Sequence, residues 1–429
     1  MFKLHTYNDL EFAKKKQIKI IQNKLLREHF DYCLSNSKYY RKHLKKLNLK
    51  KIDLDNLATL SFTDKVEIEK YNEDFLVVNK NKIVDIVLSS GTTGKPTSIA
   101  YTDSDLTRLS YNEKQSFSSC GLGSKDTVLL TCTLDRCFIA GLAYFLGIRA
   151  IGAAAIRNGV NSLESHFEVI KRMQPSAIVG VPSFLKKLGL YLAENGVSPR
   201  KSGVFKLICI GEPLRDKDLK FLKLGLQLEE LWGAKAYSTY SSSEIISTFC
   251  ECVAQNGGHL HPDLAIVEIV DRRGNLLKAG QTGELVVTPL QVEGMPLVRF
   301  KTGDISFLID APCSCGRNSL RLGPILGRKK QMMKVSGTTL YPQAVFSCLE
   351  EIGKISEYYI IATSKDRLSD NVEVYAAVND PSCTAGVIEN KLNARLRVRL
   401  KVFITDEQLI KEQVYNSKFR KPIRFIDRR

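Results

Sequence analysis

Between residues 127 and 290, short apolar runs alternate with amphipathic stretches of helical period. The apolar runs are Val128–Thr131, Ala177–Val181 and Leu207–Ile210, and the amphipathic stretches include Leu163–Met173 and Pro182–Asn195. Strands that are apolar on both faces are typical of parallel sheets covered by helices. The pattern therefore predicts an α/β fold, in which ligands gather at the carboxyl ends of the strands.

Length and composition indicate a globular protein with a large and a smaller domain. The chain has 429 residues, of which 44% are hydrophobic and 25% charged, so it can bury a sizeable core. The formal net charge is +17, but lysines and arginines are spread along the chain, without a basic segment interleaved with aromatic residues. We expect a solvated surface that suits small anionic ligands, and no nucleic-acid partner.

The sequence also predicts the compartment. No apolar run approaches the ~20 residues that cross a bilayer, and residues 1–6 lack the charged-then-apolar order of a signal peptide. The eleven cysteines are an odd number, and several, such as Cys209, lie in apolar runs, which favours reduced thiols. We expect a cytoplasmic monomer or homodimer without a membrane partner.

A segment rich in serine, threonine and glycine follows Ile83–Leu88, an apolar run that predicts a strand. It contains Ser89, Ser90, Gly91, Thr92, Thr93, Gly94, Lys95, Pro96 and Thr97. Glycines let the backbone approach a ligand closely, hydroxyls donate hydrogen bonds and lysine supplies positive charge, which together suit a polyphosphate. A Walker A loop is excluded because Ser89 replaces its first glycine and Pro96 follows Lys95. For this segment alone, an exposed turn without chemistry remains an alternative.

Three further motifs suit a nucleotide. Gly211-Glu212-Pro213-Leu214 follows the strand that ends at Ile210, where ligands of open α/β sheets bind. Thr239–Glu244 combines an aromatic ring, hydroxyls and a carboxylate, which can stack on a base, bond a phosphate and hold Mg²⁺. Asp304 ends a Lys-Thr-Gly-Asp string after a strand, where a carboxylate can accept two ribose hydroxyls.

Together, in this order, the motifs resemble those of the adenylate-forming superfamily of acyl-CoA synthetases, peptide-synthetase adenylation domains and luciferases. The helical stretch 11–48, with Ser37–Lys42 near its end, and the passage Leu54–Lys65 after it resemble the phenylacetate-CoA ligase family. The resemblance implies a multi-layer α/β adenylate-forming domain, 1–328, and a small mobile α+β lid, 329–429. In the lid we expect strands at Tyr358–Ile361 and Val372–Ala376 and a helix from Thr384 to Leu400.

The resemblance also implies the nucleotide site. The residues expected to bind ATP or AMP are Ser89, Ser90, Gly91, Thr92, Thr93, Gly94, Gly211, Glu212, Pro213, Tyr240, Ser243, Asp304 and Arg328. Tyr240 would stack on adenine, Ser243 would contact the α-phosphate and Glu244 would bind Mg²⁺. Lys95 would guide the departing pyrophosphate.

The lid would supply the remaining catalytic group. Lys421 matches the lysine that reaches the carboxylate and the α-phosphate, with Lys418 as a second candidate, and Lys330 lies at the hinge position. Three positions depart from the family pattern. These are Ser241, Gln331 and Arg420, where a glycine, an acidic residue and a glycine are usual.

Pairs of cysteines and histidines indicate a metal site. They are Cys250-x-Cys252, His259-x-His261 and Cys313-x-Cys315, and Zn²⁺ prefers four such ligands in a closed tetrahedron. Unligated thiols in turns are the alternative. Many members of the phenylacetate-CoA ligase family carry a layout that matches Cys252, His259, Cys313 and Cys315, with Cys250 and His261 as substitutes. We therefore expect a structural zinc.

Taken as a whole, the resemblance implies an ATP- and Mg²⁺-dependent acid–thiol ligase. It would adenylate a carboxylic acid, aromatic and phenylacetate-like, and transfer the acyl group to coenzyme A. The acyl pocket would lie near Leu134–Gly141, Gly211 and Ala236–Thr239. Two alternatives stay open: a stand-alone adenylation enzyme that loads an acyl carrier protein or an amine, and a catalytically silent homologue that acts as a binding protein.

Overall fold

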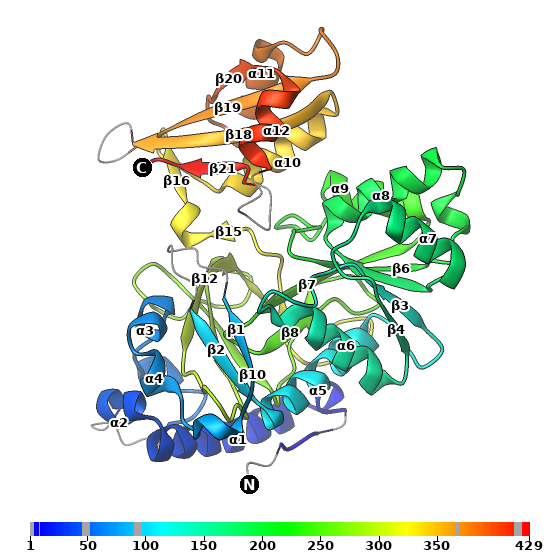
Figure 1. The fold of residues 1–429 in the computed structure, drawn as a ribbon. Helices are drawn as coiled ribbons and strands as arrows, with labels where there is room; N and C mark the ends of the chain where they lie inside the picture. The colour runs from blue at the N-terminus through cyan, green and yellow to red at the C-terminus, as the bar shows by residue number, and fades with distance from the viewer. Residues whose placement is uncertain (1–3, 8, 45–51, 90–96, 365–368, 416–422) are drawn as a thin grey trace. The chain divides into compact units, whose positions relative to one another are not determined.

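The chain forms two compact units (Figure 1). The computed structural model describes residues 4–7, 9–44, 52–89, 97–364, 369–415 and 423–429. The first unit comprises Met1–Thr302 and Ser306–Pro324, and the second comprises Gly303–Ile305 and Ile325–Arg429. The division between Pro324 and Ile325 falls just before the domain boundary that we expected.

A six-stranded sheet organises one half of the first unit. Its order is β4-β3-β5-β6-β7-β8. The strands are β3 (Thr127–Leu130), β4 (Ala154–Arg157), β5 (Ala177–Gly180), β6 (Lys206–Ile210), β7 (Lys235–Ser242) and β8 (Ser247–Cys250). Neighbours pair in parallel except β7 and β8, which are antiparallel. The predicted α/β fold is confirmed.

Helices cover this sheet and bury its apolar strands. They are α5 (Asp103–Ser119), α6 (Ile139–Ile151), α7 (Leu163–Met173), α8 (Pro182–Glu194) and α9 (Lys223–Trp232). The Ser162 side chain caps α7 by accepting a hydrogen bond from Ser165 N, and Gln174, with φ 45°, ends that helix. Trp232 is fully buried among α8, α9 and the sheet, where its Nε1 donates to Leu185 O at 3.1 Å.

The other half of the first unit is built on smaller sheets. Strands β10 (Ala265–Val270), β11 (Gly283–Pro289) and β12 (Phe300–Ser306) are neighbours in one sheet, and β13 (Leu308–Ile309), β14 (Arg321–Leu322) and β9 (Gly258–His259) form another. Gly303–Ile305 of β12 belong to the second unit, where they pair with β15 (Gly327–Arg328). The hairpin of β1 (Ile83–Leu88) and β2 (Ser98–Thr102) is antiparallel. The strand predicted at Ile83–Leu88 is therefore present, as half of this hairpin.

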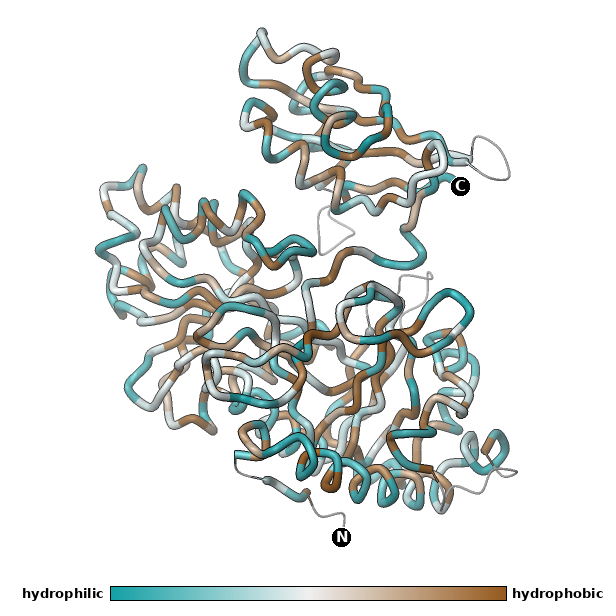
Figure 2. The backbone as a smooth tube through the Cα atoms, turned by 180° about the vertical axis from the view of Figure 1, so that it is seen from behind, coloured by the Kyte–Doolittle hydropathy of each residue, from teal (hydrophilic) through white to brown (hydrophobic). Residues whose placement is uncertain are grey.

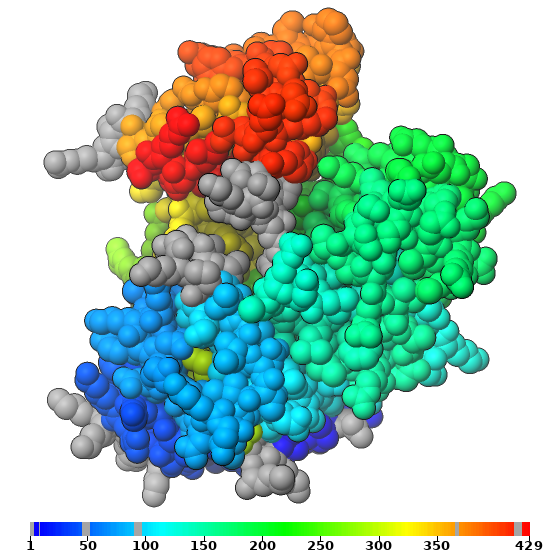
Figure 3. All heavy atoms as spheres, viewed as in Figure 1, coloured from blue at the N-terminus to red at the C-terminus, as the bar shows by residue number. Residues whose placement is uncertain are grey.

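The amino-terminal part of the chain is helical, as predicted. It contains the 3₁₀ turn η1 (Leu10–Phe12), α1 (Lys15–Asn36), α2 (Lys38–Leu44), α3 (Lys65–Lys70) and α4 (Asn72–Phe75). Asn72 joins α4 to the β1–β2 hairpin, since its side chain donates to Ser98 O at 2.9 Å and accepts from Ser98 Oγ at 3.0 Å. Figure 3 shows these blue and light-blue segments side by side on one face of the first unit.

Figure 2 shows hydrophobic residues concentrated along the strands in the interior of the first unit, with hydrophilic residues on outer helices and loops. This distribution follows the alternating pattern of the sequence. Within the described ranges, no helix is both long and apolar enough to cross a membrane.

The second unit is a small α+β structure around a four-stranded sheet of order β20-β19-β18-β21. Its strands are β18 (Ile355–Ser364), β19 (Asp370–Val378), β20 (Lys401–Ile404) and β21 (Phe425–Asp427), with helices α10 (Pro342–Ile352), α11 (Ala385–Leu396) and α12 (Glu407–Val414). A 3₁₀ turn, η6 (Lys329–Gln331), and the hairpin of β16 (Met333–Val335) and β17 (Thr338–Leu340) precede α10. Both predicted strands lie within β18 and β19.

The helix predicted from Thr384 to Leu400 is too long. It ends at Leu396 because Arg397 adopts a left-handed conformation with φ 58°. Val398 and Leu400 then alternate with exposed residues and are 3% and 2% exposed, as in an extended segment packed on a core. The chain continues into β20.

Candidate nucleotide and metal sites

The two ends of the predicted phosphate loop are joined to each other. Ser89 N donates to Thr97 O at 2.9 Å, and Thr97 N donates to Ser89 Oγ at 3.4 Å. Both residues are buried, at 5% and 7% exposed. The β1–β2 pairing therefore extends to the base of this loop. Residues 90–96, including Lys95, lie outside the described residues.

The Gly211–Pro213 turn lies at the carboxyl end of β6, beside β7. Ile210 is opposite Thr239 in the parallel register, and Gly211 has φ 76°, a conformation that favours glycine. The Glu212 carboxylate accepts hydrogen bonds from Ser183 N at 2.9 Å and Ser183 Oγ at 2.8 Å. Because Ser183 lies in the first turn of α8, this carboxylate compensates the helix amino terminus.

Glu244 follows β7 and forms an ion pair with Lys65. The distance from Lys65 Nζ to Glu244 Oε1 is 2.7 Å, and the Ser242 hydroxyl donates to the other carboxylate oxygen. Burial by itself would raise the pKa of Glu244, but the charge and hydrogen bond of Lys65 and the Ser242 hydrogen bond hold that pKa below its usual value. The carboxylate is therefore ionised and already compensated by a cation.

Tyr240 and Ser243 lie on the same segment as Glu244. The Tyr240 ring stacks with Phe249 on β8, with 6.5 Å between centroids. The Tyr101 hydroxyl donates to Ser243 O at 2.8 Å and so ties the segment to β2. The fold thus brings together Tyr240, Ser243, Glu244 and the Gly211 turn at the ends of two adjacent parallel strands.

The four predicted zinc ligands converge. One ligand atom from each of Cys252, His259, Cys313 and Cys315 lies within 4.8 Å of all the others. The Sγ atoms of Cys252 and Cys313 are 3.6 Å apart, and Cys315 Sγ is 3.3 Å from His259 Nε2. These spacings are those of donors around one tetrahedral ion, so the donor set fits Zn²⁺.

Hydrogen bonds outside the cluster orient its imidazole. His259 Nδ1 is 3.0 Å from Ser319 Oγ, which leaves Nε2 directed at the thiols. The two substitute ligands are engaged elsewhere. Cys250 Sγ lies 3.3 Å from Thr239 Oγ1, and His261 contacts Glu11 and Ser116.

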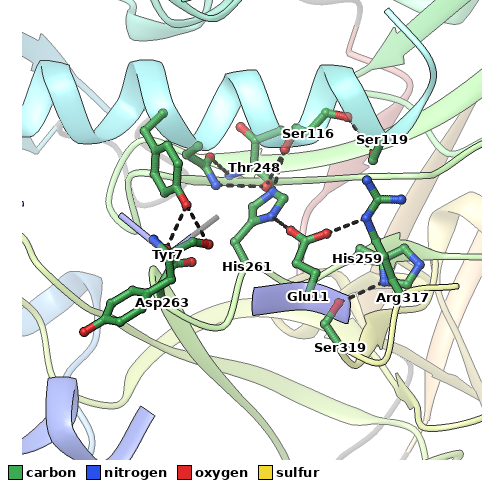
Figure 4. A network of polar contacts seen from close by, with 12 residues as sticks. Tyr7, Glu11, Ser116, Ser119, Thr248, His259, His261, Asp263, Arg317 and Ser319 are labelled. Carbon is green, nitrogen blue, oxygen red and sulfur yellow. Dashed lines mark hydrogen bonds and ion pairs between the residues drawn. The ribbon is translucent and has the colours of Figure 1, made fainter. Parts of the chain in front are cut away.

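The amino-terminal turn η1 contacts the loops that carry the candidate metal ligands (Figure 4). The Glu11 carboxylate contacts His261 Nδ1 and accepts from Arg317 Nε at 2.6 Å, while its backbone carbonyl accepts from the Asn318 and Ser319 amides. Burial would raise the pKa of Glu11, but His261 and Arg317 together lower it. One buried carboxylate therefore joins the start of the chain to two loops that carry the cluster.

In the second unit, the strand pair β12–β15 brings two predicted residues together. Asp304 lies opposite Arg328, and Arg328 Nε is 3.3 Å from Asp304 Oδ1. Lys330 is exposed on η6, and its carbonyl accepts from Arg429 Nη2 at 3.3 Å. Lys418 and Lys421 lie outside the described residues.

Comparison with known proteins identifies the family of this chain. The family described as AMP-binding enzyme matches residues 31–293, which is more than half of the chain. The chain belongs to the AMP-binding enzyme family.

This AMP-binding enzyme is similar to phenylacetate-coenzyme A ligases over most of its length. The ligase of Thermus thermophilus is 29% identical over 382 residues, which cover 87% of this chain and 84% of that protein. The ligase of Pseudomonas putida is 28% identical over 374 residues, covering 85% and 83%. The predicted resemblance to the phenylacetate-CoA ligase family is confirmed.

A solved structure shares the fold of this AMP-binding enzyme. The crystal structure of 2-hydroxyisobutyryl-CoA ligase in the postadenylation state, in complex with R3-HIB-AMP, superposes with a TM-score of 0.86 at 19% identity. The match covers 98% of this chain and 92% of that one.

The predicted site residues of this AMP-binding enzyme did not include Lys65 or Glu11. Lys65 is one of many lysines, and its ion pair with Glu244 joins positions far apart in the chain. Glu11 precedes the first helix and carries no motif. Lys65 is the last residue of the Leu54–Lys65 passage, and this was the only signal that could have drawn attention to it.

Proposed function

We propose that this AMP-binding enzyme is an ATP-dependent acid–thiol ligase. It adenylates a carboxylic acid, aromatic and phenylacetate-like, and transfers the acyl group to coenzyme A. The observation that carries the proposal is that two nucleotide motifs, Gly211–Pro213 and Tyr240–Glu244, lie side by side at the ends of β6 and β7. The similarity to phenylacetate-coenzyme A ligases over most of the chain supports the same activity.

In the first step, a carboxylate oxygen of the substrate attacks the α-phosphorus of ATP in line. The bond from that phosphorus to the bridging oxygen breaks, and pyrophosphate leaves. Tyr240 stacks on adenine, the Gly211–Pro213 turn lines the adenine slot, and Ser243 bonds the α-phosphate. The hydroxyls and amides of Ser89–Gly94, with Lys95, guide the pyrophosphate.

The second unit contributes to both steps. Lys421 neutralises charge on the attacked phosphoryl group, Asp304 accepts the ribose hydroxyls, and Arg328 contacts the ribose and phosphate. The unit then rotates about Lys330. The sulfur of coenzyme A attacks the acyl carbon, and AMP leaves with the electrons of the broken acyl–oxygen bond.

Two metals belong to the proposal. Glu244 would hold Mg²⁺, which screens the charge of the phosphates when bound. Cys252, His259, Cys313 and Cys315 would hold a structural Zn²⁺ that joins loops of the first unit and takes part in no chemical step. Thiolate ligands require reduced cysteines, which favours the cytoplasm as the compartment.

ATP–pyrophosphate exchange over aromatic, cinnamic and short aliphatic acids tests the adenylation step. We expect exchange that depends on the acid and is strongest with arylacetic acids. The Lys421→Ala variant should lose exchange, whereas Lys418→Ala, its matched control, should retain it. Exchange lost in Lys418→Ala and kept in Lys421→Ala would reverse the assignment.

The acceptor is tested separately. Release of AMP that depends on coenzyme A, with the thioester seen by mass spectrometry, is the expected result. Exchange without this release would favour a carrier protein or an amine as the acceptor. Absence of exchange with every acid, in protein that still binds AMP, would favour a silent homologue.

A further inference from the structure

A buried ion pair joins Glu251 to Arg215, which lies two residues after the Gly211–Pro213 turn. Arg215 Nε donates to Glu251 Oε1 at 2.6 Å, and Arg215 Nη2 donates to Oε2 at 3.3 Å. The two side chains are 6% and 2% exposed. The guanidinium also lies 3.8 Å from the ring centroid of Phe221, and its Nη1 donates to Leu219 O at 3.2 Å. A bidentate pair held on several sides fixes the backbone that carries it.

Glu251 connects this turn to two other parts of the first unit. Its Oε2 accepts from Ser238 N on β7 at 2.9 Å, and its Oε1 accepts from Gly257 N at 3.4 Å. Ser238 precedes Tyr240 on the same strand, and Gly257 precedes β9, which contains His259. Glu251 is also the neighbour of Cys252 in the chain. One carboxylate therefore contacts Arg215, two residues beyond the turn, the strand of Tyr240 and the segment that leads to His259.

The turn is anchored on its other side by Glu212. Its carboxylate accepts two hydrogen bonds from Ser183 at the start of α8. The segment from Gly211 to Arg215 thus has two anchors, one through Ser183 on α8 and one through Glu251, which follows β8 and contacts β7. Because the Glu212 side chain serves α8, the turn presents mainly its backbone and the proline ring to a ligand.

We infer that Arg215 and Glu251 are positioning residues of the adenine slot. Their ion pair fixes the distance between the Gly211–Pro213 backbone and Tyr240. It also links this part of the slot to the segment of Cys252, the chain neighbour of Glu251. This inference rests on the proposed function, in which the turn and Tyr240 bind adenine. Neither residue touches reacting atoms, so their loss changes nucleotide affinity and leaves the chemical step intact.

The test compares Glu251→Gln and Arg215→Lys with the parent enzyme. The geometry predicts that each variant raises KM for ATP about tenfold, because small displacements of a binding surface are costly. Calorimetry should show AMP affinity reduced by the same factor. The kcat, KM for the acid and zinc content should stay at parent values, which separates positioning from general damage.

Glu11→Gln is the matched control. Glu11 is also buried and also paired with an arginine, but it contacts no residue of the turn. This variant should lose stability and keep the parent KM for ATP. An equal rise in KM for ATP in Glu11→Gln would overturn the inference. The rise in KM of the Arg215 and Glu251 variants would then be explained by their loss of stability alone.

A double variant keeps the inference testable if the single variants fail to fold. Arg215→Met with Glu251→Met removes both charges, and apolar replacement of a buried pair is often neutral for stability. A double variant that folds should still show the raised KM for ATP and the weakened AMP binding. Parent-like AMP binding in any folded variant would overturn the inference. Absence of exchange in the parent would instead contradict the ligase activity, and AMP calorimetry would still decide the positioning role.

Discussion

The cysteine–histidine cluster of the first unit and the Asp304–Arg328 pair of the second unit both join residues that sequence motifs had singled out, but they differ in burial. Cys252 and His259 are fully buried, and their neighbours Glu11 and Ser319 are buried too. The Arg328 side chain, by contrast, is 47% exposed. Cys313 and Cys315 are partly exposed, and Asp304 is buried. The contrast is therefore between the buried Cys252 and His259 and the exposed Arg328 end of the pair.

The difference shows which contacts belong to the fold and which are available to a ligand. A buried set of donors with several partners contributes to the free energy of unfolding, because breaking it leaves polar groups unpaired. A half-exposed ion pair contributes about 1 kcal/mol or less. If Asp304 binds ribose as proposed, it can exchange Arg328 for a ligand hydroxyl at a small cost in stability.

Removal of the cluster should have the largest effect. Cys252→Ser should lower the free energy of unfolding by about 4 kcal/mol, as expected when a structural metal is lost. Chemical denaturation with and without a chelator, together with metal analysis, checks this. Cys137→Ser, at an exposed cysteine outside the cluster, should have no such effect. A chelator that leaves the parent's denaturation midpoint unchanged would contradict a structural metal.

Glu11→Gln should have the next largest effect. It removes the charge that Arg317 and His261 share, which should lower the free energy of unfolding by about 2 kcal/mol. Glu28→Gln on the exposed face of α1 is the control and should change stability little. Equal midpoints of denaturation for Glu11→Gln and Glu28→Gln would show that the contacts of Glu11 contribute nothing to the free energy of unfolding.

Asp304→Asn should affect ligand binding more than stability. Loss of the charged acceptor should raise KM for ATP about tenfold, the size of one charged hydrogen bond, while stability changes by about 1 kcal/mol or less. Steady-state kinetics and denaturation curves measure both. A large loss of stability with unchanged KM for ATP would show that Asp304 serves the fold and not the ligand, which contradicts the prediction.

Arg328→Met should have the smallest effect. The residue is exposed, so KM for ATP should rise about threefold and stability should hardly change. Arg395→Met is the control, since Arg395 is also exposed in the second unit and pairs with Glu351 at 3.2 Å. A loss of stability in Arg328→Met as large as that in Cys252→Ser would show that the exposed pair and the cluster contribute equally to the free energy of unfolding.

The sequence predicted those features that depend on local chemistry. The apolar runs at Val128, Ala177 and Leu207 marked parallel strands, because burial on both faces requires continuous apolar residues. The pairs of cysteines and histidines indicated a metal site, and the family resemblance selected Cys252, His259, Cys313 and Cys315 from the six candidates. These four residues lie close together in the structure.

Features that depend on distant contacts were not predictable in the same way. Glu11, Lys65 and Glu251 have partners far from them in the chain. Lys65 and Glu251 lie inside stretches that the sequence marked, but those stretches do not reveal their partners. The end of α11 was missed because Arg397 adopts a left-handed conformation without being glycine or asparagine. In each case the tertiary environment decided the outcome.

The use of the Glu212 carboxylate by α8 bears on how the adenine slot can evolve. If the turn binds adenine as proposed, base selection falls to peptide groups of Gly211 and its neighbours, which side-chain substitutions do not alter directly. Selection then acts on whatever keeps the main chain in place, and the rest of the surface is free to diverge.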